Sequence, residues 1–245
     1  MDYQQVEVVS FLERPNRFIA YCQKTDGEII TAHVKNTGRG REVFLPGAQV
    51  AVTYTPSPKR KTDYDLIAVK KKDAWFNIDS QLPNQLAAEG ILNGKIQLPE
   101  LMGEITFLKR EVVYHHSKFD IYLETSTNQK IFVEVKGMTL ENLAVGAFPD
   151  APTTRGLKHI LELVDAHKEG YLTYVLFIAQ FEQLTVSTIH QEMQPEFALA
   201  IRAAQTEGVQ VLTYNCLVNA DSVRLKQRIP FDLDAPFKNP VNENN

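Results

Sequence analysis

The sequence predicts an α+β protein of two domains, in which a small β-barrel precedes a larger α/β domain. A change of pattern near residue 80 of the 245-residue chain carries this prediction. Residues 1–80 hold short runs of β-branched and aromatic residues separated by turn signals. In residues 81–245, helical apolar spacing alternates with nearly continuous apolar strands, which indicates an α/β domain with a mixed sheet.

The first domain has five predicted strands and few helical signals. Thr25-Asp26-Gly27 is a strong hairpin turn between the second and third of them. Five short strands suggest a small Greek-key barrel of the OB type, and an SH3-like barrel would give much the same pattern. The predicted strands are VEVVSFL, RFIAYCQ, EIITAHV, AQVAVTY and DLIAVK.

The second domain is predicted to hold three helices and five strands. Apolar residues at helical spacing favour a first helix over about 82 to 92. In the second, TTRGLKHILELVDAHKEG, either Thr153 or Thr154 can cap the start. The third helix is PEFALAIRAAQTEG. The strands are ITFLKREVVY, KFDIYLE, KIFVEVKG, YLTYVLFIAQF and VQVLTYNCLV.

Composition limits the classes of function. The formal net charge of −4 means that the protein as a whole does not attract nucleic acid, so nucleic acid would have to bind through local basic patches. Cys22 and Cys216 lie far apart without metal-ligand spacing, which argues against a zinc site or a disulfide framework. The sequence contains neither an apolar run long enough to span a membrane nor a signal-peptide pattern, so a cytoplasmic protein without membrane partners is expected.

The strands KFDIYLE and KIFVEVKG form a predicted hairpin whose register places charges together. If the turn is symmetric about Thr127, one face of the hairpin is entirely apolar. The other face then sets Asp120 opposite Glu134 and Lys118 opposite Lys136. Directly opposed side chains have Cβ atoms roughly 5 Å apart, so two carboxylates would lie side by side.

Such a carboxylate pair repels unless a cation lies between its members. Mg²⁺, or Mn²⁺, accepts oxygen ligands from one or two carboxylates, so Asp120 and Glu134 are predicted metal ligands. Lys136 could stabilise a phosphate or hold an attacking water, and Glu89 is a third candidate carboxylate. The alternatives are a solvated edge strand with a salt bridge for Glu134 and Lys136, and a solvent-facing helix position for Glu89.

Basic residues gather in the first turns of the second predicted helix. Arg155, Lys158 and His159 are expected opposite its apolar stripe, which includes Leu161. A helix N-terminus favours anions, so these three residues are predicted to contact phosphate. An ordinary exposed basic face is the alternative.

Three loops of the first domain could also contact a phosphodiester backbone. The segments RPNRF, NTGRGR and PKRKTDYD combine basic side chains with an aromatic residue or with glycines whose backbone N–H groups are accessible. The predicted nucleic-acid contacts in these segments are Arg17, Asn36, Thr37, Arg39 and Lys61.

Together these motifs resemble the sugar fermentation stimulation proteins (SfsA). The resemblance runs along nearly the whole chain, through NRF, NTGR, RKTDYDL, NQLAAEGI, SKFD, VEVKGMTL and FPDAPTTRGLKHI. It implies an OB-like N-terminal domain, a C-terminal domain similar to the PD-(D/E)XK nucleases, and DNA binding. The nuclease-like motif matches Asp120, then Glu134 and Lys136 as its E-x-K, and Glu89 as its helical glutamate. Family members often have Arg in place of Lys118 and Ser in place of Gly137, which removes no metal ligand.

The leading hypothesis is a DNA-binding protein whose second domain keeps a metal-dependent phosphodiesterase site. In this hypothesis Asp120 and Glu134 hold Mg²⁺, Lys136 assists the attacking water, and Glu89 orients water or a second ion. The alternative is a non-catalytic DNA-binding regulator of sugar metabolism. A weaker third possibility is a binder of nucleotides or other small phosphorylated molecules.

Overall fold

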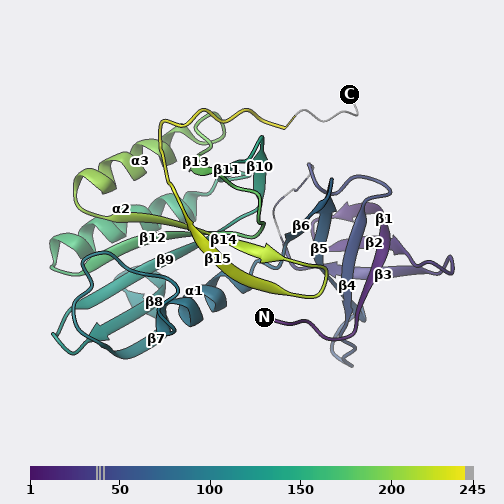
Figure 1. Cartoon of the computed structure of the whole chain (residues 1–245), viewed down its shortest axis with the longest axis horizontal. Coiled ribbons are helices and arrows are strands. Elements are labelled where there is room, and N and C mark those ends of the chain that lie inside the picture. Colours follow the sequence, from purple (N-terminus) through teal and green to yellow (C-terminus); the bar gives the residue numbers. More distant parts are fainter. Residues whose placement is uncertain (37, 39, 41, 241–245) are drawn as a thin grey trace.

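The N-terminal strands close into the predicted barrel. In this computed structural model, which describes residues 1–36, 38, 40 and 42–240, β3 pairs with β2 on one side and with β5 on the other. The first five strands therefore form a closed ring, with β6 added along β5 (Figure 1). The strands are β1 (Val6–Asn16), β2 (Ile19–Gln23), β3 (Ile29–Val34), β4 (Gln49–Tyr54), β5 (Tyr64–Lys71) and β6 (Ala74–Asn77).

The second domain is built on a six-stranded mixed sheet, as the sequence predicts. Its strand order is β15-β14-β12-β9-β8-β7, in which β9, β12 and β14 run parallel and the outer pairs are antiparallel. The strands are β7 (Ile105–Tyr114), β8 (Ser117–Thr125), β9 (Lys130–Met138), β12 (Leu172–Ala179), β14 (Gln210–Val218) and β15 (Val223–Ile229).

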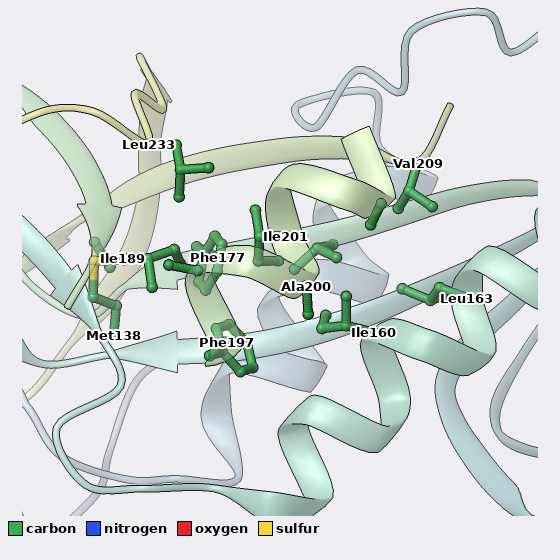
Figure 2. Packing of buried hydrophobic residues seen from close by; sticks show 14 of the residues in the cluster. Met138, Ile160, Leu163, Phe177, Ile189, Phe197, Ala200, Ile201, Val209 and Leu233 are labelled. Carbon is green, nitrogen blue, oxygen red and sulfur yellow. The ribbon is translucent and has the colours of Figure 1, made fainter. Parts of the chain in front are cut away.

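Helices cover both faces of this sheet. On one face, α1 (Leu82–Leu92) packs against apolar residues such as Ile121 and Val133. On the other, α2 (Thr154–Lys168) packs over β12, and α3 (Pro195–Thr206) packs against α2 and β14. Ile160 and Phe197 of these helices belong to the same core as Phe177 of β12 (Figure 2). Since alternate residues of β12 belong to the two cores, its nearly continuous apolar sequence is explained.

The sequence did not predict several short strands. Besides β6 and β15, these are β10 (Leu140–Asn142), β11 (Val145–Phe148) and β13 (Val186–Ile189), which form a small separate sheet. Strands of three or four residues carry too little periodicity to be recognised from sequence. None of the helices in the described ranges is long and apolar enough to cross a membrane.

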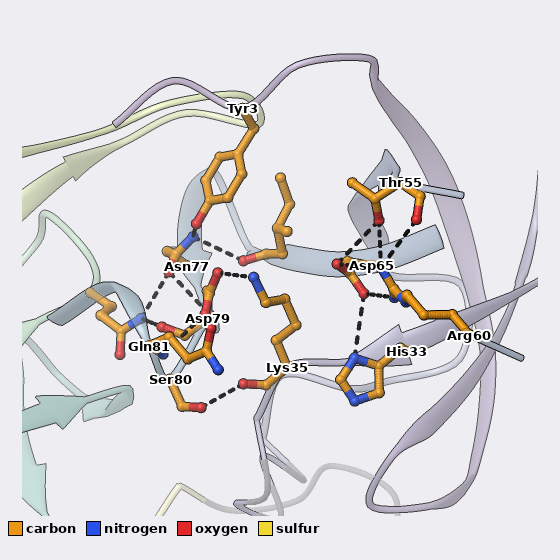
Figure 3. A network of polar contacts seen from close by, with 12 residues as sticks. Tyr3, His33, Lys35, Thr55, Arg60, Asp65, Asn77, Asp79, Ser80 and Gln81 are labelled. Carbon is orange, nitrogen blue, oxygen red and sulfur yellow. Dashed lines mark hydrogen bonds and ion pairs between the residues drawn. The ribbon is translucent and has the colours of Figure 1, made fainter. Parts of the chain in front are cut away.

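A buried polar network joins the barrel to the second domain. Asn77 of β6 is fully buried, and its carboxamide accepts a hydrogen bond from Gln180 Nε2 (2.8 Å) and donates one to the Tyr3 hydroxyl (3.0 Å). Asp79 pairs with Lys35 of the barrel at 2.6 Å (Figure 3). Because these groups are buried and mutually satisfied, the network fixes how the barrel lies beside the sheet.

One lysine of the run Lys70-Lys71-Lys72 forms a further contact between the barrel and the second domain. Lys71 is largely buried and pairs with Glu141 of β10 at 2.8 Å. Its Nζ also donates a hydrogen bond to the Glu141 carbonyl oxygen at 2.7 Å. Lys71 is therefore a second polar connection between the two domains.

Candidate active site

The β8–β9 hairpin has the predicted register. Ile121 faces Val133, Tyr122 faces Phe132 and Leu123 faces Ile131. The pairing ends there: Phe119, predicted to lie beside Ile121 and opposite Val135, packs instead in the core beneath α2. Asp120 nevertheless lies next to β9, because its Oδ2 accepts a hydrogen bond from the Val135 N–H. β9 lies inside the sheet, between β8 and β12, and Glu134 is only 1% exposed. The alternative of a solvated edge strand is therefore wrong.

Glu134 is a buried carboxylate held through one of its two oxygens. Its Oε1 accepts hydrogen bonds from Lys136 Nζ (2.5 Å) and from the His159 ring through Nδ1. Its Oε2 is buried and has no hydrogen-bond partner among the described residues. Burial raises the pKa of Glu134, but Lys136 and His159 outweigh burial and lower this pKa below its ordinary value. The carboxylate is therefore charged, and its hydrogen bonds within the described protein all fall on one oxygen.

Asp120 is held by one hydrogen bond to each oxygen. Asn84 of α1 donates to Oδ1 (2.7 Å), and the Val135 backbone N–H donates to Oδ2 (2.8 Å). Burial, and then the negative charge of Glu134, raise the pKa of Asp120 to about 6. The negative charges of Asp120 and Glu134 therefore repel each other, as expected if the two carboxylates lie side by side.

The structure brings a different residue of α1 to Asp120 than the sequence suggested. Glu89 is exposed, and it accepts a hydrogen bond from Gln85 Nε2 at 2.8 Å. Asn84 is the α1 side chain that contacts Asp120. Five helical positions separate Asn84 from Glu89, so the two side chains point roughly 140° apart. The catalytic role of Glu89 stays a prediction, and sequence reasoning missed Asn84 because it considered only charged groups at the acidic centre.

The rotation of α2 about its axis also differs from the expectation. The helix begins where expected, with the Thr153 side chain accepting a hydrogen bond from the Gly156 N–H (2.9 Å). However, His159 is buried against Glu134, and Leu161 is 53% exposed. The expected placement of His159 opposite the apolar face was wrong, because the buried face of the helix runs through Gly156, His159, Ile160 and Leu163.

Arg155 and Lys158 lie on the exposed side of the same helix, as predicted. Arg155 Nε lies 3.5 Å from His159 Nε2, and Lys158 Nζ donates a hydrogen bond to the His116 carbonyl oxygen (2.6 Å). Because a guanidinium can only donate, this contact leaves Nε2 of His159 as an acceptor and its Nδ1 as the donor to Glu134. His159 therefore orients the carboxylate, a role that the sequence did not reveal.

The barrel contributes loops that lie next to the segment preceding α2. Arg17, Gly38 and Ala151 line one cavity of about 700 Å³. The Arg17 guanidinium lies over the Phe18 ring, 5.0 Å from its centroid, and Asn36 Oδ1 accepts a hydrogen bond from the Gly38 N–H at 2.7 Å.

Among the described residues, one predicted barrel contact lies away from this cavity. Lys61 is exposed on the loop between β4 and β5 and does not line the cavity within the described chain. Thr37 and Arg39 lie outside the described residues. Arg14 belongs to RPNRF, one of the segments predicted to contact a phosphodiester backbone, and it donates hydrogen bonds to the carbonyl oxygens of Asn36 (2.6 Å) and Gly38 (2.9 Å). Arg14 thereby holds the shape of the loop that carries the predicted contacts.

These features define a class of two-domain proteins in which a five-stranded barrel adjoins a mixed sheet with a buried acidic centre. Family models identify it further: the SfsA N-terminal OB domain matches residues 12–78, and the sugar fermentation stimulation protein RE domain matches residues 81–222. The chain therefore belongs to the sugar fermentation stimulation protein family.

Individual relatives agree over almost their whole length. The sugar fermentation stimulation protein homolog of Enterococcus mundtii is 65% identical, over 98% of this chain and 99% of the relative. The homolog of Clostridium beijerinckii is 42% identical, over 94% and 98%. The solved structure of Pyrococcus furiosus SfsA in complex with Ca²⁺ matches with a TM-score of 0.83 and 26% identity, over 95% of this chain and 98% of that one. The predicted family and fold are thus confirmed.

The repulsion between Asp120 and Glu134 predicts that Asp120→Asn stabilises the metal-free protein. The raised pKa of Asp120 means that the folded state favours the neutral side chain. Protonation of Asp120 therefore stabilises the folded state fully below pH 4, and this stabilisation is lost as the pH rises through about 6. Removing the charge should therefore raise the free energy of unfolding at pH 8 by up to roughly 2–3 kcal/mol. Urea unfolding in EDTA measures it.

The pH dependence supplies the control for this prediction. Near pH 4, where Asp120 is already largely neutral in the folded protein, the difference between wild type and Asp120→Asn should shrink towards zero. A variant that is equally or less stable than wild type at pH 8 would show that the pair does not repel.

Proposed function

We propose that this protein is a DNA-binding nuclease that depends on a divalent metal ion. The observation that carries the proposal is the buried Oε2 of Glu134, which lacks a hydrogen-bond partner among the described residues. The same carboxylate lies close enough to Asp120 for its charge to raise the pKa of Asp120. A buried anionic oxygen without a partner is unfavourable unless a ligand satisfies it. A cation between the two carboxylates would satisfy that oxygen and relieve their repulsion at once.

The donor set fits a hard cation such as Mg²⁺ or Mn²⁺. Both candidate ligands are carboxylates, and the described residues contain no group of three or more His, Cys, Asp and Glu that could enclose a metal. Mg²⁺ is usually bound by one or two carboxylates, with water and substrate phosphate completing its shell. The Ca²⁺ complex of the Pyrococcus furiosus relative supports an oxygen-ligand cation in this family.

Each residue of the site then has a proposed task. When bound, the metal ion would supply positive charge to the scissile phosphate and lower the pKa of a coordinated water. His159 and Lys136 fix one oxygen of Glu134, so its other oxygen has a defined direction. Asn84 fixes Asp120 in the same way. The Lys136 ammonium, only partly exposed, is placed to stabilise charge that develops on the phosphate.

Two groups of basic residues are proposed to hold the nucleic-acid backbone. On α2, Arg155 and Lys158 are exposed beside His159, whose buried ring acts on Glu134 rather than on phosphate. The barrel residues proposed to contact DNA are Arg17, Asn36, Thr37, Arg39 and Lys61. Glu89 is proposed to orient water or a second ion, which would require its exposed side chain to turn from Gln85 towards Asp120.

Cleavage assays test the catalytic proposal. With Mg²⁺ or Mn²⁺, the purified protein should cut DNA, and both Glu134→Gln and Lys136→Met should lower the rate at least 100-fold. Removing the metal with EDTA should abolish cleavage, and added Mg²⁺ should restore it. Glu182→Gln is the matched control, because Glu182 is an exposed glutamate paired with Lys226.

Single- and double-stranded DNA and RNA should all be offered as substrates. If the wild type cuts nothing that Glu134→Gln fails to cut, catalysis is disproved and the non-catalytic DNA-binding regulator is the function that remains.

Binding measurements test the barrel loops. Neutralising Arg17, Arg39 and Lys61 together, each to Gln, should weaken DNA binding and reduce the slope of log K against log salt by about 2–3, since each phosphate contact contributes about 0.7–0.9. Fluorescence anisotropy in EDTA measures this without cleavage.

The control for the barrel variant carries the same change of charge elsewhere on the molecule. Lys95, Lys130 and Lys168 are exposed and lie in the second domain, so changing all three to Gln alters net charge equally. Equal loss of affinity in the two triple variants would show that only net charge matters and that the barrel loops have no special role.

A further inference from the structure

A cavity of about 640 Å³ lies next to the proposed metal site, between the turn joining β7 to β8 and the first turns of α2. Its lining includes His116, Ser117, Lys118, Thr154, Arg155 and Lys158. His159 forms part of the same wall. The described lining contains no aspartate or glutamate, although the protein as a whole has a formal charge of −4.

Acidic neighbours partly compensate the cations of this cavity, and one of them, Glu169, lies 3.4 Å from the lining residue His115. Lys118 pairs with Glu111 at 2.7 Å, and Lys158 lies 3.5 Å from Glu162, so these two lysines are partly neutralised. Arg155 instead contacts the His159 ring, and this contact does not neutralise the positive charge of the Arg155 guanidinium. Cations grouped around a cavity raise the local concentration of anions.

Ser117 supplies independent evidence that the cavity accepts a ligand. The residue is only 7% exposed and lines the cavity, and its hydroxyl oxygen is buried without a hydrogen-bond partner among the described residues. A buried hydroxyl is unfavourable without a partner. Because this oxygen has almost no accessible surface, rotation of the Ser117 side chain to another rotamer would be needed to bring its hydroxyl to an anionic ligand in the cavity.

The cavity and the acidic centre share one side chain. His159 contacts Arg155 through Nε2 on the cavity side and Glu134 through Nδ1 on the other. Lys158 also connects α2 to the β7–β8 turn across the cavity wall, because its Nζ donates a hydrogen bond to the His116 carbonyl oxygen at 2.6 Å. A ligand in the cavity would therefore lie one imidazole ring away from the carboxylate that is proposed to bind the metal.

We propose that this cavity is a phosphate subsite that holds a second phosphate group of the bound strand, next to the one that is cut. The inference rests on the proposed function for the identification of the ligand as a nucleic-acid strand. Binding of phosphate to the cavity requires neither metal nor cleavage. The subsite uses the Lys118 and Arg155 cations and the Ser117 hydroxyl, which together match the charge and the acceptor oxygens of phosphate. It explains why the basic cluster lies at this end of the sheet.

Binding of inorganic phosphate to the full chain in EDTA tests the subsite. The imidazole resonance of His116, assigned with His116→Gln, should shift saturably on addition of phosphate. Ser117→Ala should weaken binding about 3-fold to 10-fold and Lys118→Gln at least 10-fold. Lys130→Gln, at the opposite end of β9 from the acidic centre, should bind as wild type. Absence of a shift, or equal binding by wild type and Lys118→Gln, would overturn the proposal.

Oligonucleotides separate the two sources of the phosphate group. In EDTA, a subsite for a terminal phosphate predicts at least 10-fold tighter binding of a 5′- or 3′-phosphorylated strand than of its unphosphorylated counterpart, with the gain lost in Lys118→Gln. A subsite for an internal phosphodiester predicts equal binding of all strands and a similar loss in Lys118→Gln. If Lys118→Gln and Ser117→Ala bind every strand as wild type does, the subsite is disproved, whatever the cleavage assays show.

Discussion

The burial of Glu134 within the central sheet is the constraint on which the site depends. A carboxylate that is 1% exposed can remain charged only if positive or hydrogen-bonding groups surround it, and Lys136 and His159 provide them at one oxygen. They leave the other oxygen without a partner in the described protein and Asp120 with a raised pKa. The metal-free site is thus incompletely satisfied, which is typical of sites that bind a cation.

The fold places these groups by ordinary packing. Val133 and Val135 belong to the apolar core beneath α1, so alternation along β9 turns Glu134 towards the other face, where α2 lies. The buried face of α2 carries His159 to the same point. Asn84 reaches Asp120 from α1, so both helices contribute to a site centred on one hairpin. The loops of the barrel approach the segment just before α2.

The sequence predicted those parts of the site that depend on strand periodicity. The apolar alternation in KFDIYLE and KIFVEVKG, with a turn centred on Thr127, predicts the observed pairing from Leu123–Ile131 to Ile121–Val133. Asp120 follows directly after that pairing, close enough to Glu134 for the negative charge of Glu134 to raise the pKa of Asp120. By contrast, the rotation of α2 could not be predicted, because a histidine at a core position looks polar until its partner is known. His159 is buried only because Glu134 lies opposite to it.

The same reasoning explains the remaining differences. Asn84 carries no charge, and its contact with Asp120 depends on how α1 crosses the sheet, which is a tertiary property. The strands β10, β11 and β13 are stabilised by pairing with one another rather than by a pattern of their own. Ser117 and the basic cavity likewise depend on how the β7–β8 turn lies against α2.

The central claim is that Glu134 Oε2 and Asp120 together bind a divalent cation. Anomalous diffraction from crystals of the protein soaked in Mn²⁺ tests this claim most directly. The account predicts one strong peak at a bonding distance of about 2.0–2.4 Å from Glu134 Oε2 and from an Asp120 oxygen. A well-ordered site without a peak, or a Mn²⁺ ion bound elsewhere while Glu134 keeps only Lys136 and His159, would contradict it.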